Sequence, residues 1–356
     1  MEKEFAIVPY YVLTINGKNV TQDVSAFLSS VEYNDKLEAE SDDVQLVIDD
    51  VAGLWQSSWY PQQGDSLTLK MGYKGNMIDC GLFEIDEIEL SGQPDVMTVK
   101  AIAAAVMKAI RTKSSKNYEK QSLRQIAQFV ADKHELTIVG DTSKLSKITV
   151  EQKTQDNESD LSFLCNLAKE YGFVFSVRGK QLIFIDPEEL ENKSTIATFR
   201  GSQLSTYSFK DKTSETFDGA VVSKRNVKEN KVTNWKDVMH SVSAKVDTLI
   251  VGGNAENDSQ AEAKAKGALR EKNKDKLTGS FAIDGNPLLV AGVNVDLQEF
   301  GAFSGKWTVT GSRHKIEVGS GYVTDVLLRK GPYQKTVQAA KGNSESKNWA
   351  KIMGIS

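Results

Sequence analysis

A short pattern of turns and strands occurs twice in this chain of 356 residues, and it constrains the fold more than any other feature. Each copy has the order proline, glycine, strand, glycine, aromatic strand, strand, and the copies cover residues 61–101 and 287–328. The strand-like segments of the two copies are 66–71, 81–85 and 97–101, and 293–297, 305–309 and 322–328. The pattern predicts two β units of similar construction. Chance likeness between β-rich segments is the alternative.

Residues 1–110 are predicted to form the first of these β units. Apolar residues occupy every second position of residues 66–71, as in a strand with one buried face. Asn16-Gly17 is a dipeptide typical of two-residue hairpin turns. Along residues 83–90 the apolar positions change phase once, at Asp86-Glu87, and a β-bulge there would account for the change.

Residues 111–200 have a different pattern, which predicts a small α+β domain. A Ser-x-x-Gln capping box at 122–125 marks the start of one helix. A second helix is predicted over residues 159–171, and it ends at Gly172 because glycine readily adopts the left-handed conformation that terminates helices. A β-hairpin is expected to follow over residues 173–185.

Residues 201–330 are predicted to form the second β unit, with a helical insertion near residues 256–274. The insertion is rich in Ala and Lys and has a narrow apolar stripe. The remaining residues, 331–356, form a mostly polar tail. Its end has apolar residues at nearly helical spacing between Trp349 and Ile355, so both a docking peptide and a frayed terminus fit the pattern.

The charge balance excludes a strongly basic protein, because 44 Lys and Arg stand against 48 Asp and Glu, a net charge of −4. Proteins that grip nucleic acids usually carry a basic excess that neutralises phosphates. We therefore expect no specific nucleic-acid binding, although DNA could still pass through a channel. The two cysteines make no disulfide or zinc pattern, and Cys165 is predicted to be a small buried residue on the apolar face of its helix.

The start of the chain, Met1–Glu4, is charged and shows no secretory signal. The longest apolar stretch, 101–110, contains Lys108 and is much shorter than the roughly 20 residues that span a bilayer. These features predict synthesis in the cytoplasm and no insertion into a membrane.

Motifs that carry known chemistry are missing from the sequence. It has no glycine-rich phosphate loop after a strand, no HExxH pair and no GxSxG elbow. His134, His240 and His314 are far apart, and each is predicted to lie at the surface or at the edge of a core. The carboxylates of residues 84–89 alternate along one strand, which favours a face turned to solvent or to a lumen over a glycosidase pair. We therefore predict no catalytic, cofactor or metal site.

Two basic clusters, at 108–120 and 224–236, are predicted to lie on solvated loops and hairpin tips rather than on a nucleic-acid interface. One dense aromatic cluster, Trp55, Trp59 and Tyr60, precedes Pro61. It is predicted to pack at the start of a strand. An exposed cluster of this kind would instead indicate a carbohydrate- or receptor-binding module.

Three segments in the same order resemble the late control D family, the tail hub proteins of contractile-tailed phages and related injection machines. The most specific segment covers residues 157–172, which begin Asn-Glu-Ser-Asp-Leu-Ser-Phe-Leu and end Tyr-Gly. The other segments are Gln-Ser-Leu-Arg-Gln-Ile-Ala at 121–127 with Glu-Leu at 135–136, and Gly-Asn-Pro at 285–287 with Ala-Gly at 291–292, Ser-Gly-Lys-Trp at 304–307 and Thr310. The resemblance extends over residues 8–330.

The resemblance implies a structural role without enzymatic activity: a homotrimeric ring that joins the hexameric tail tube to the trimeric central spike. Subunits of this family carry two tail-tube-like β-barrels with a small α+β domain between them, so three subunits present six barrels. The implied partners are the tail tube, the spike, the tape-measure protein and other baseplate proteins. The implied location is the tail baseplate of a particle made in a bacterial host.

Two features depart from the family pattern. The tail after residue 330 matches no part of the family core, and no spike-like β-helix or cell-wall-degrading domain follows it. The piercing part is therefore expected to be a separate polypeptide. The alternatives for function are a cell-wall hydrolase or a receptor-binding tail-tip module of the same machine.

Overall fold

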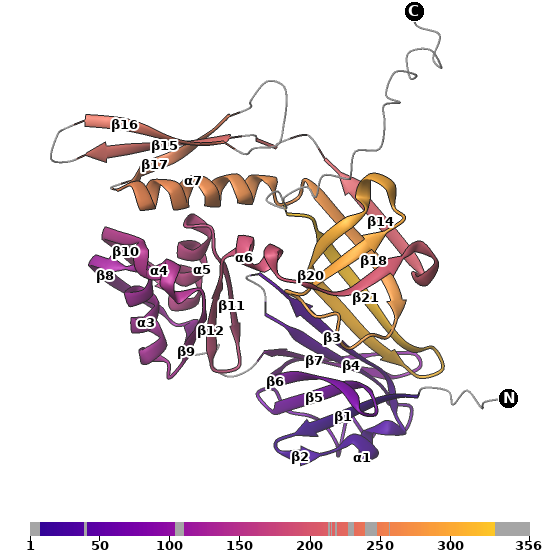
Figure 1. The fold of residues 1–356 in the computed structure, drawn as a ribbon. Coiled ribbons are helices and arrows are strands. Elements are labelled where there is room, and N and C mark those ends of the chain that lie inside the picture. The colour runs from indigo at the N-terminus through magenta and orange to yellow at the C-terminus, as the bar shows by residue number, and fades with distance from the viewer. Residues whose placement is uncertain are drawn as a thin grey trace, which may run out of the picture.

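The computed structural model describes residues 8–38, 41–103, 110–212, 214, 216–217, 219–226, 231–238, 248–255 and 257–331. The chain is a β-rich α+β protein, with two groups of strands at one side and an α+β region at the other (Figure 1). No helix within the described residues is both long enough and apolar enough to span a membrane.

The first group of strands comes from the N-terminal third of the chain. Its order is β1-β5-β6-β7-β4-β3, with the short β2 beside β1, and neighbouring strands are antiparallel. The elements are β1 Pro9–Ile15, β2 Lys18–Asn19, α1 Thr21–Ser25, β3 Leu28–Lys36, β4 Asp43–Asp49, β5 Ser66–Tyr73, β6 Asn76–Ser91 and β7 Val96–Ala103. The predicted hairpin turn is confirmed, because Ile15 pairs with Lys18 across Asn16-Gly17.

The second group of strands comes from the C-terminal half and has the order β13-β19-β20-β21-β18-β14. The elements are β13 Thr195–Arg200, the 3-10 helix η1 Gly201–Gln203, β14 Thr206–Asp211, β18 Leu277–Asp284, β19 Asn294–Gln298, the 3-10 helix η2 Gly301–Phe303, β20 Gly305–Glu317 and β21 Gly321–Arg329. Ranked along the chain, the strands of both groups are arranged 1-4-5-6-3-2. One pairing differs, since β1 is antiparallel to β5 whereas β13 is parallel to β19.

The likeness of the two groups extends to the register of single residues. In the first group Gly81 pairs with Leu69 and Phe83 with Leu67. At the same places in the second group Gly305 pairs with Leu297 and Trp307 with Val295. Both glycines have positive φ, +101° and +111°, a conformation that side chains disfavour. The two groups therefore share a register, which a mere abundance of strands would not produce.

Backbone hydrogen bonds repeat as well. The Gly64 N–H donates to the Ile85 carbonyl at 2.8 Å, and the Gly292 N–H donates to the Val309 carbonyl at 2.9 Å. The predicted bulge is confirmed, because the β6–β7 register shifts between Ile85 and Glu87. The β20–β21 register shifts between Val309 and Gly311, at the equivalent place.

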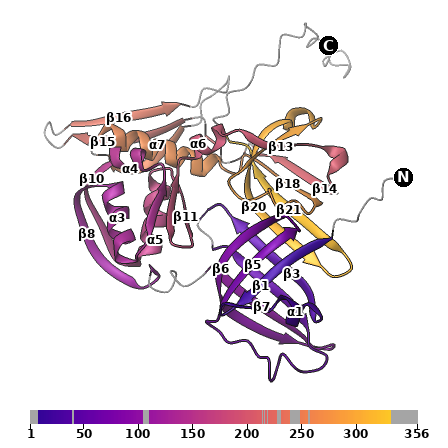
Figure 2. The same cartoon turned by 60° about the horizontal axis from the view of Figure 1, so that its bottom comes forward.

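The two groups are joined along one seam by the antiparallel pairing of two strands. Strand β3 pairs with β20 from Gly311 opposite Lys36 to Glu317 opposite Ser30, and one 13-stranded sheet results. Within the described residues no strand pairing closes either group into a barrel. Figure 2 shows the first group from below, with β3 passing toward β20.

The region between the two groups is built from helices and two small sheets. Its elements are β8 Lys113–Ser122, α3 Leu123–Lys133, β9 Thr137–Gly140, α4 Thr142–Lys147, β10 Thr149–Ser159, α5 Asp160–Glu170, β11 Val174–Arg178, β12 Gln181–Ile185 and α6 Pro187–Asn192. The capping box is confirmed, since Gln125 N–H donates to Ser122 Oγ at 3.2 Å and Ser122 N–H donates to Gln125 Oε1 at 2.8 Å. The predicted hairpin is also confirmed, because β11 and β12 pair antiparallel.

The expected helical insertion is α7 Asp258–Asn273, which lies between two layers (Figure 1). One face packs on a three-stranded sheet of β15 Gly219–Asn226, β16 Lys231–Val238 and β17 Thr248–Ala255. Ala261, Ala265 and Leu269 are fully buried in that contact. The opposite side contacts the α+β region, where Lys264 forms an ion pair with Glu170 at 3.0 Å. The narrow apolar stripe is thus buried on one face only.

Candidate functional site

A buried carboxylate, Asp35, lies where the three parts of the molecule meet. It sits at the end of β3 with 1% of its surface exposed. Arg178, at the end of β11, donates from Nη2 to Asp35 Oδ1 at 2.5 Å. The backbone N–H of Ala291, in the loop before β19, donates to Oδ2 at 2.7 Å. One carboxylate therefore links the first strand group, the α+β region and the second strand group.

A second carboxylate completes this junction. Asp42 Oδ2 lies 3.7 Å from Arg178 Nε, and its Oδ1 accepts the Lys36 N–H at 2.9 Å. Burial raises the pKa of Asp42 to about 6, against the opposing effect of Arg178. Burial also raises the pKa of Asp35, and again Arg178 opposes the shift. Asp35 and Asp42 share the one guanidinium of Arg178, which holds the cluster together. The cluster therefore has more carboxylates than cations.

Apolar contacts surround the ionic cluster. Leu37, Val174, Leu190 and Ala291 form a small core of their own, with less than a tenth of each residue exposed. Helix α6 is fixed to this junction by Asn294, whose Nδ2 donates to the Leu190 carbonyl at 2.8 Å and to the Lys193 carbonyl at 3.0 Å. The arrangement resists relative movement of the three parts, because a shift would expose both apolar surface and a buried charge.

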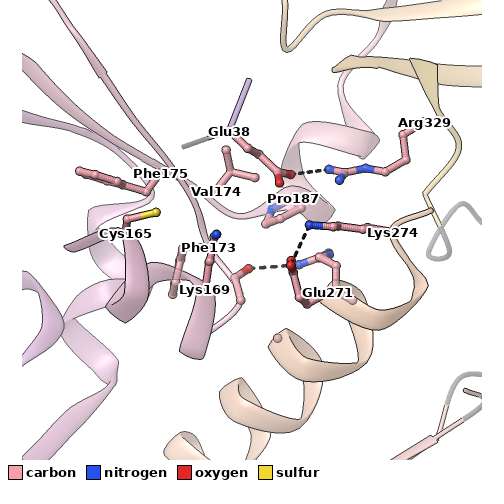
Figure 3. Close-up of a pocket in the computed structure, with 13 residues that line it drawn as sticks. Glu38, Cys165, Lys169, Phe173, Val174, Phe175, Pro187, Glu271, Lys274 and Arg329 are labelled. Atoms are coloured by element: carbon pink, nitrogen blue, oxygen red, sulfur yellow. Dashed lines mark hydrogen bonds and ion pairs between the residues drawn. The ribbon is translucent and has the colours of Figure 1, made fainter. Parts of the chain in front are cut away.

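A small pocket with a cavity volume of about 40 Å³, partly open to solvent, lies beside this junction between α5, α7 and the end of β3 (Figure 3). Its charged walls are already paired. Arg329 donates to Glu38 at 2.8 Å, and Lys274 donates to Glu271 at 2.7 Å. Cys165 is half buried at the rim and burial raises the pKa of its thiol. The described residues contain no group of three His, Cys, Asp or Glu side chains suited to a metal ion.

Two glycines let α5 and α7 meet closely at the pocket. A Cβ on Gly267 would lie 2.7 Å from the Gly172 backbone nitrogen, a distance that real side chains do not tolerate. Gly172 has φ of +77° and ends α5, as the sequence predicted. The structure adds a second reason for glycine at this position, namely the close approach of α7.

The family-like segment at 157–172 holds a buried network of hydrogen bonds and ion pairs around Asp160. Asp160, at the start of α5, is 1% exposed and is surrounded by donors. It accepts hydrogen bonds from Lys133 Nζ at 2.7 Å, Gln155 Nε2 at 2.8 Å and Ser114 Oγ at 3.2 Å, and His134 Nε2 lies 2.7 Å away. Burial would raise the pKa of Asp160, but these hydrogen bonds outweigh it and lower the value to about 2. The network ties β8, β10 and α3 to α5.

The two described histidines lie in different parts of the fold, and the prediction for one of them is wrong. His134 lies at a core edge, paired with Asp160. His314 is fully buried, because it lies in the β3–β20 seam and its ring nitrogens find partners there. Tyr322 Oη lies 2.7 Å from Nδ1, and the Leu289 carbonyl lies 3.1 Å from Nε2. His240 lies outside the described residues.

The carboxylates of β6 behave as predicted for an exposed face. Asp86, Glu87 and Glu89 are exposed and Glu84 is half buried. Glu87 pairs with Lys100 of the neighbouring strand at 3.0 Å. Along β6 the structure thus shows a row of mostly exposed carboxylates.

The first basic cluster was predicted on loops, and this is wrong for its described part, because residues 113–120 belong to strand β8. There Lys116 Nζ lies 2.8 Å from the centroid of the Phe129 ring. The described residues of the second cluster, 224–226 and 231–236, also lie in strands, namely β15 and β16, and the tip between these strands lies outside the described residues. Residues 108–109 and the tail after Gly331 lie outside the described residues.

The aromatic cluster packs before β5. Trp55 is buried and makes an edge contact with Trp59 at 5.6 Å, and both contact Phe27. Trp59 and Tyr60 keep 44% and 53% of their surface exposed. Cys80 is buried and Cys165 is half buried, and both are free thiols.

Sequence reasoning missed Asp35 and Arg178. A charged residue inside a strand gives no periodicity signal, and Arg178 stands next to the glycine of the hairpin turn, where charged residues are common. The sequence does hold a signal that relates β3 of the first strand group to β14 of the second. Residues 31–36 and 207–212 each carry an aromatic residue two positions before the dipeptide Asp-Lys.

A family model described as phage tail baseplate hub (GPD) matches residues 92–320, more than half of the chain. This chain belongs to the baseplate hub family. A curated relative, the probable baseplate hub protein of Escherichia phage 186, is 30% identical over 182 residues. The matched part covers 51% of this chain and 46% of that relative, so the chain spans about half the length of the curated relative.

Solved structures show the same fold at low identity. A tail protein from Neisseria meningitidis MC58 matches 90% of this chain and 96% of its own, with a TM-score of 0.65 and 12% identity. The E. coli c3393 protein, a component of the type VI secretion system with similarity to the T4 tail proteins gp27 and gp5, matches 85% of this chain and 73% of its own. Its TM-score is 0.51 at 13% identity. The fold of the hub family is therefore shared with phage tails and a secretion machine.

Proposed function

We propose that this hub-family chain works as a non-enzymatic symmetry adaptor, three copies of which form a ring between a hexameric tail tube and a trimeric central spike. The observation that carries the proposal is the duplicated strand group. Each chain supplies two groups with the same strand order, the same register and the same bulge. Three chains then present six equivalent groups to a sixfold partner, while the rest of each chain keeps threefold symmetry.

The proposed division of the chain follows its buried cores, except that β13 and its buried Phe199, before residue 201, belong to the core of the second strand group. Residues 1–110 and 201–330 would form two tail-tube-like β-barrels completed by their neighbours in the ring. Residues 111–200 would form the α+β domain and residues 331–356 a terminal tail. The separate cores of the two strand groups and of the α+β region support this division.

The role proposed is mechanical. The Asp35–Arg178 junction makes the three parts of one subunit resist relative movement, as a ring under contraction forces requires. The partners proposed are the tail tube, the spike, the tape-measure protein and neighbouring baseplate proteins, on a tail particle made in the host cytoplasm. DNA would pass through the lumen without specific binding.

Native mass spectrometry and negative-stain imaging of the purified full chain test the proposal. A mass of three chains, together with ring-shaped averages that show six similar lobes on one face, is expected. A dimeric or tetrameric mass, or an open filament, would contradict it. Incubation with purified peptidoglycan separates the proposed role from that of a hydrolase, since release of sugar or peptide fragments would identify an enzyme.

A further inference from the structure

The seam inside one chain shows how two strand groups join. Strand β3 is the edge strand of the first group, and it pairs with the distal part of β20, residues 311–317. That part of β20 is available because β19 is short and pairs only with residues 305–308. Strand β3 of the first group therefore pairs with the part of β20 that is not paired with the short strand β19.

The duplicated register identifies the equivalent places outside this seam. A transverse row through the first group joins Tyr33, Val44, Ala101 and Ile85. The same row through the second group joins Phe209, Gly279, Leu328 and Val309. Strand β14 is therefore the counterpart of β3, and β6 is the counterpart of β20.

Strands β14 and β6 each have an edge without a partner strand among the described residues, on the side that corresponds to the β3–β20 seam. Among the described strands, β14 pairs only with β18, and its residues are exposed except for the half-buried Phe209. On β6, residues 87–91 pair with β7 on one side, and no described strand pairs with them on the other. Leu90 there is 49% exposed, whereas His314 at the equivalent place in the seam is fully buried. One chain thus contains one paired seam, β3 with β20, and two equivalent strand edges, on β14 and β6, that have no partner strand within the described residues.

We propose that β14 of one copy pairs antiparallel with the distal part of β6, residues 87–91, of the next copy. The seam between subunits would then repeat the β3–β20 seam within each subunit. This inference rests on the proposed ring and names its interface. The register follows from the seam in the chain, where Arg313 lies opposite Asn34 and His314 opposite Tyr33. Glu89 of one copy then lies opposite Lys210 of the next, and Leu90 lies opposite Phe209.

Charge and polarity support this register. Glu87 would face Lys212 and Glu89 would face Lys210, so that both outward pairs join opposite charges. A slip by one residue would place Glu89 opposite Asp211 and Leu90 opposite Lys210, or Glu89 opposite Phe209 and Leu90 opposite Ser208. The exposed Leu90 and the half-buried Phe209 become a buried cross-strand pair, as His314 and Tyr33 are in the inner seam.

Cysteine cross-linking of the full chain tests the register. Glu89→Cys with Lys210→Cys places the two thiols at a directly opposed pair, where disulfide geometry is accessible. Cys165→Ser removes the half-buried native thiol from all variants. A matched control combines Glu89→Cys with Thr206→Cys, which lies on the same face of β14 but about 13 Å further along it.

Mild oxidation of the in-register variant should give a covalent trimer on a non-reducing gel, and each single-cysteine variant should give none. The out-of-register control should cross-link several-fold more slowly. A trimer in native mass spectrometry without cross-linking of the in-register pair would overturn the interface and leave the ring standing. Monomers in native mass spectrometry, together with no cross-linked trimer on the gel at high protein concentration, would overturn both the proposed ring and the proposed interface.

Charge reversal gives an independent readout. Glu89→Lys or Lys210→Glu alone should weaken trimer formation about twofold to fivefold at each interface, since like charges then lie opposite each other. The double reversal should restore assembly, because the pair is again complementary. Equal weakening in the double variant would contradict the pairing.

Discussion

Two equivalent positions, His314 on β20 and Leu90 on β6, have opposite environments. His314 lies opposite Tyr33 in the filled seam, is fully buried and forms hydrogen bonds through both ring nitrogens. Leu90 occupies the same place in the first strand group and is 49% exposed. The backbone plan is the same in both groups, so the difference comes from the strand that lies beside each. In the proposed ring, β14 of the next copy covers Leu90 as β3 covers His314.

The largest effect is expected from the equivalent core residues Trp307 and Phe83. Both are almost fully buried, at 0% and 1% exposure. Trp307→Ala and Phe83→Ala should each lower the free energy of unfolding by about 3–5 kcal/mol, through lost burial and the cavity left behind. Urea unfolding followed by tryptophan fluorescence and circular dichroism measures this. A loss under about 1 kcal/mol at only one of the two positions would show that the groups are packed differently.

The next effect concerns pH. Burial lowers the pKa of His314 to about 4, below its ordinary value of 6.5. The unfolded chain therefore binds this proton at a higher pH than the folded chain does. The corresponding stability is complete above pH 6.5 and is lost as the pH falls toward 4, by about 3 kcal/mol in total.

His314→Gln removes the titration while keeping a polar side chain in the seam. Between pH 6.5 and 4 the wild type should lose about 3 kcal/mol more than this variant in chemical unfolding. The comparison with the variant is needed because Asp42, with a pKa of about 6, contributes in the opposite direction. Parallel stability curves for the two proteins would show that His314 does not titrate differently on folding.

A smaller effect is expected at the three-way junction. Arg178→Met leaves Asp35 buried without its cation, and we expect a loss of about 2 kcal/mol, because Arg178 is partly exposed and water offsets some of the cost. Arg313→Met is the matched control, since its pair with Asp325 is exposed and should contribute less than about 1 kcal/mol. Thermal and urea unfolding compare the two. Equal losses would contradict the special role of the junction.

The smallest effect is expected at Leu90. Leu90→Ser should change the free energy of unfolding of the isolated chain by less than about 0.5 kcal/mol, because the side chain is exposed there. Analytical ultracentrifugation of the same variant should show weaker trimer formation. A large loss of stability in the monomer would mean that Leu90 already packs within its own chain.

The sequence alone predicted the local elements of the fold and the family. Asn16-Gly17, the Ser122 capping box and Gly172 act through the backbone of neighbouring residues, and Asp86 marks a bulge through a change in alternation, so each could be predicted from a short window. The recurrence of proline, glycine and strand also predicted two similar units.

Only the tertiary structure showed how those units meet. The Asp35 carboxylate, the Arg178 guanidinium and the Ala291 amide come from distant parts of the chain, and no local pattern marks a charge that is buried by long-range contacts. The burial of His314 likewise depends on which strand lies beside β20. Strand pairing and burial are properties of the whole fold, because they depend on neighbours in space rather than in sequence.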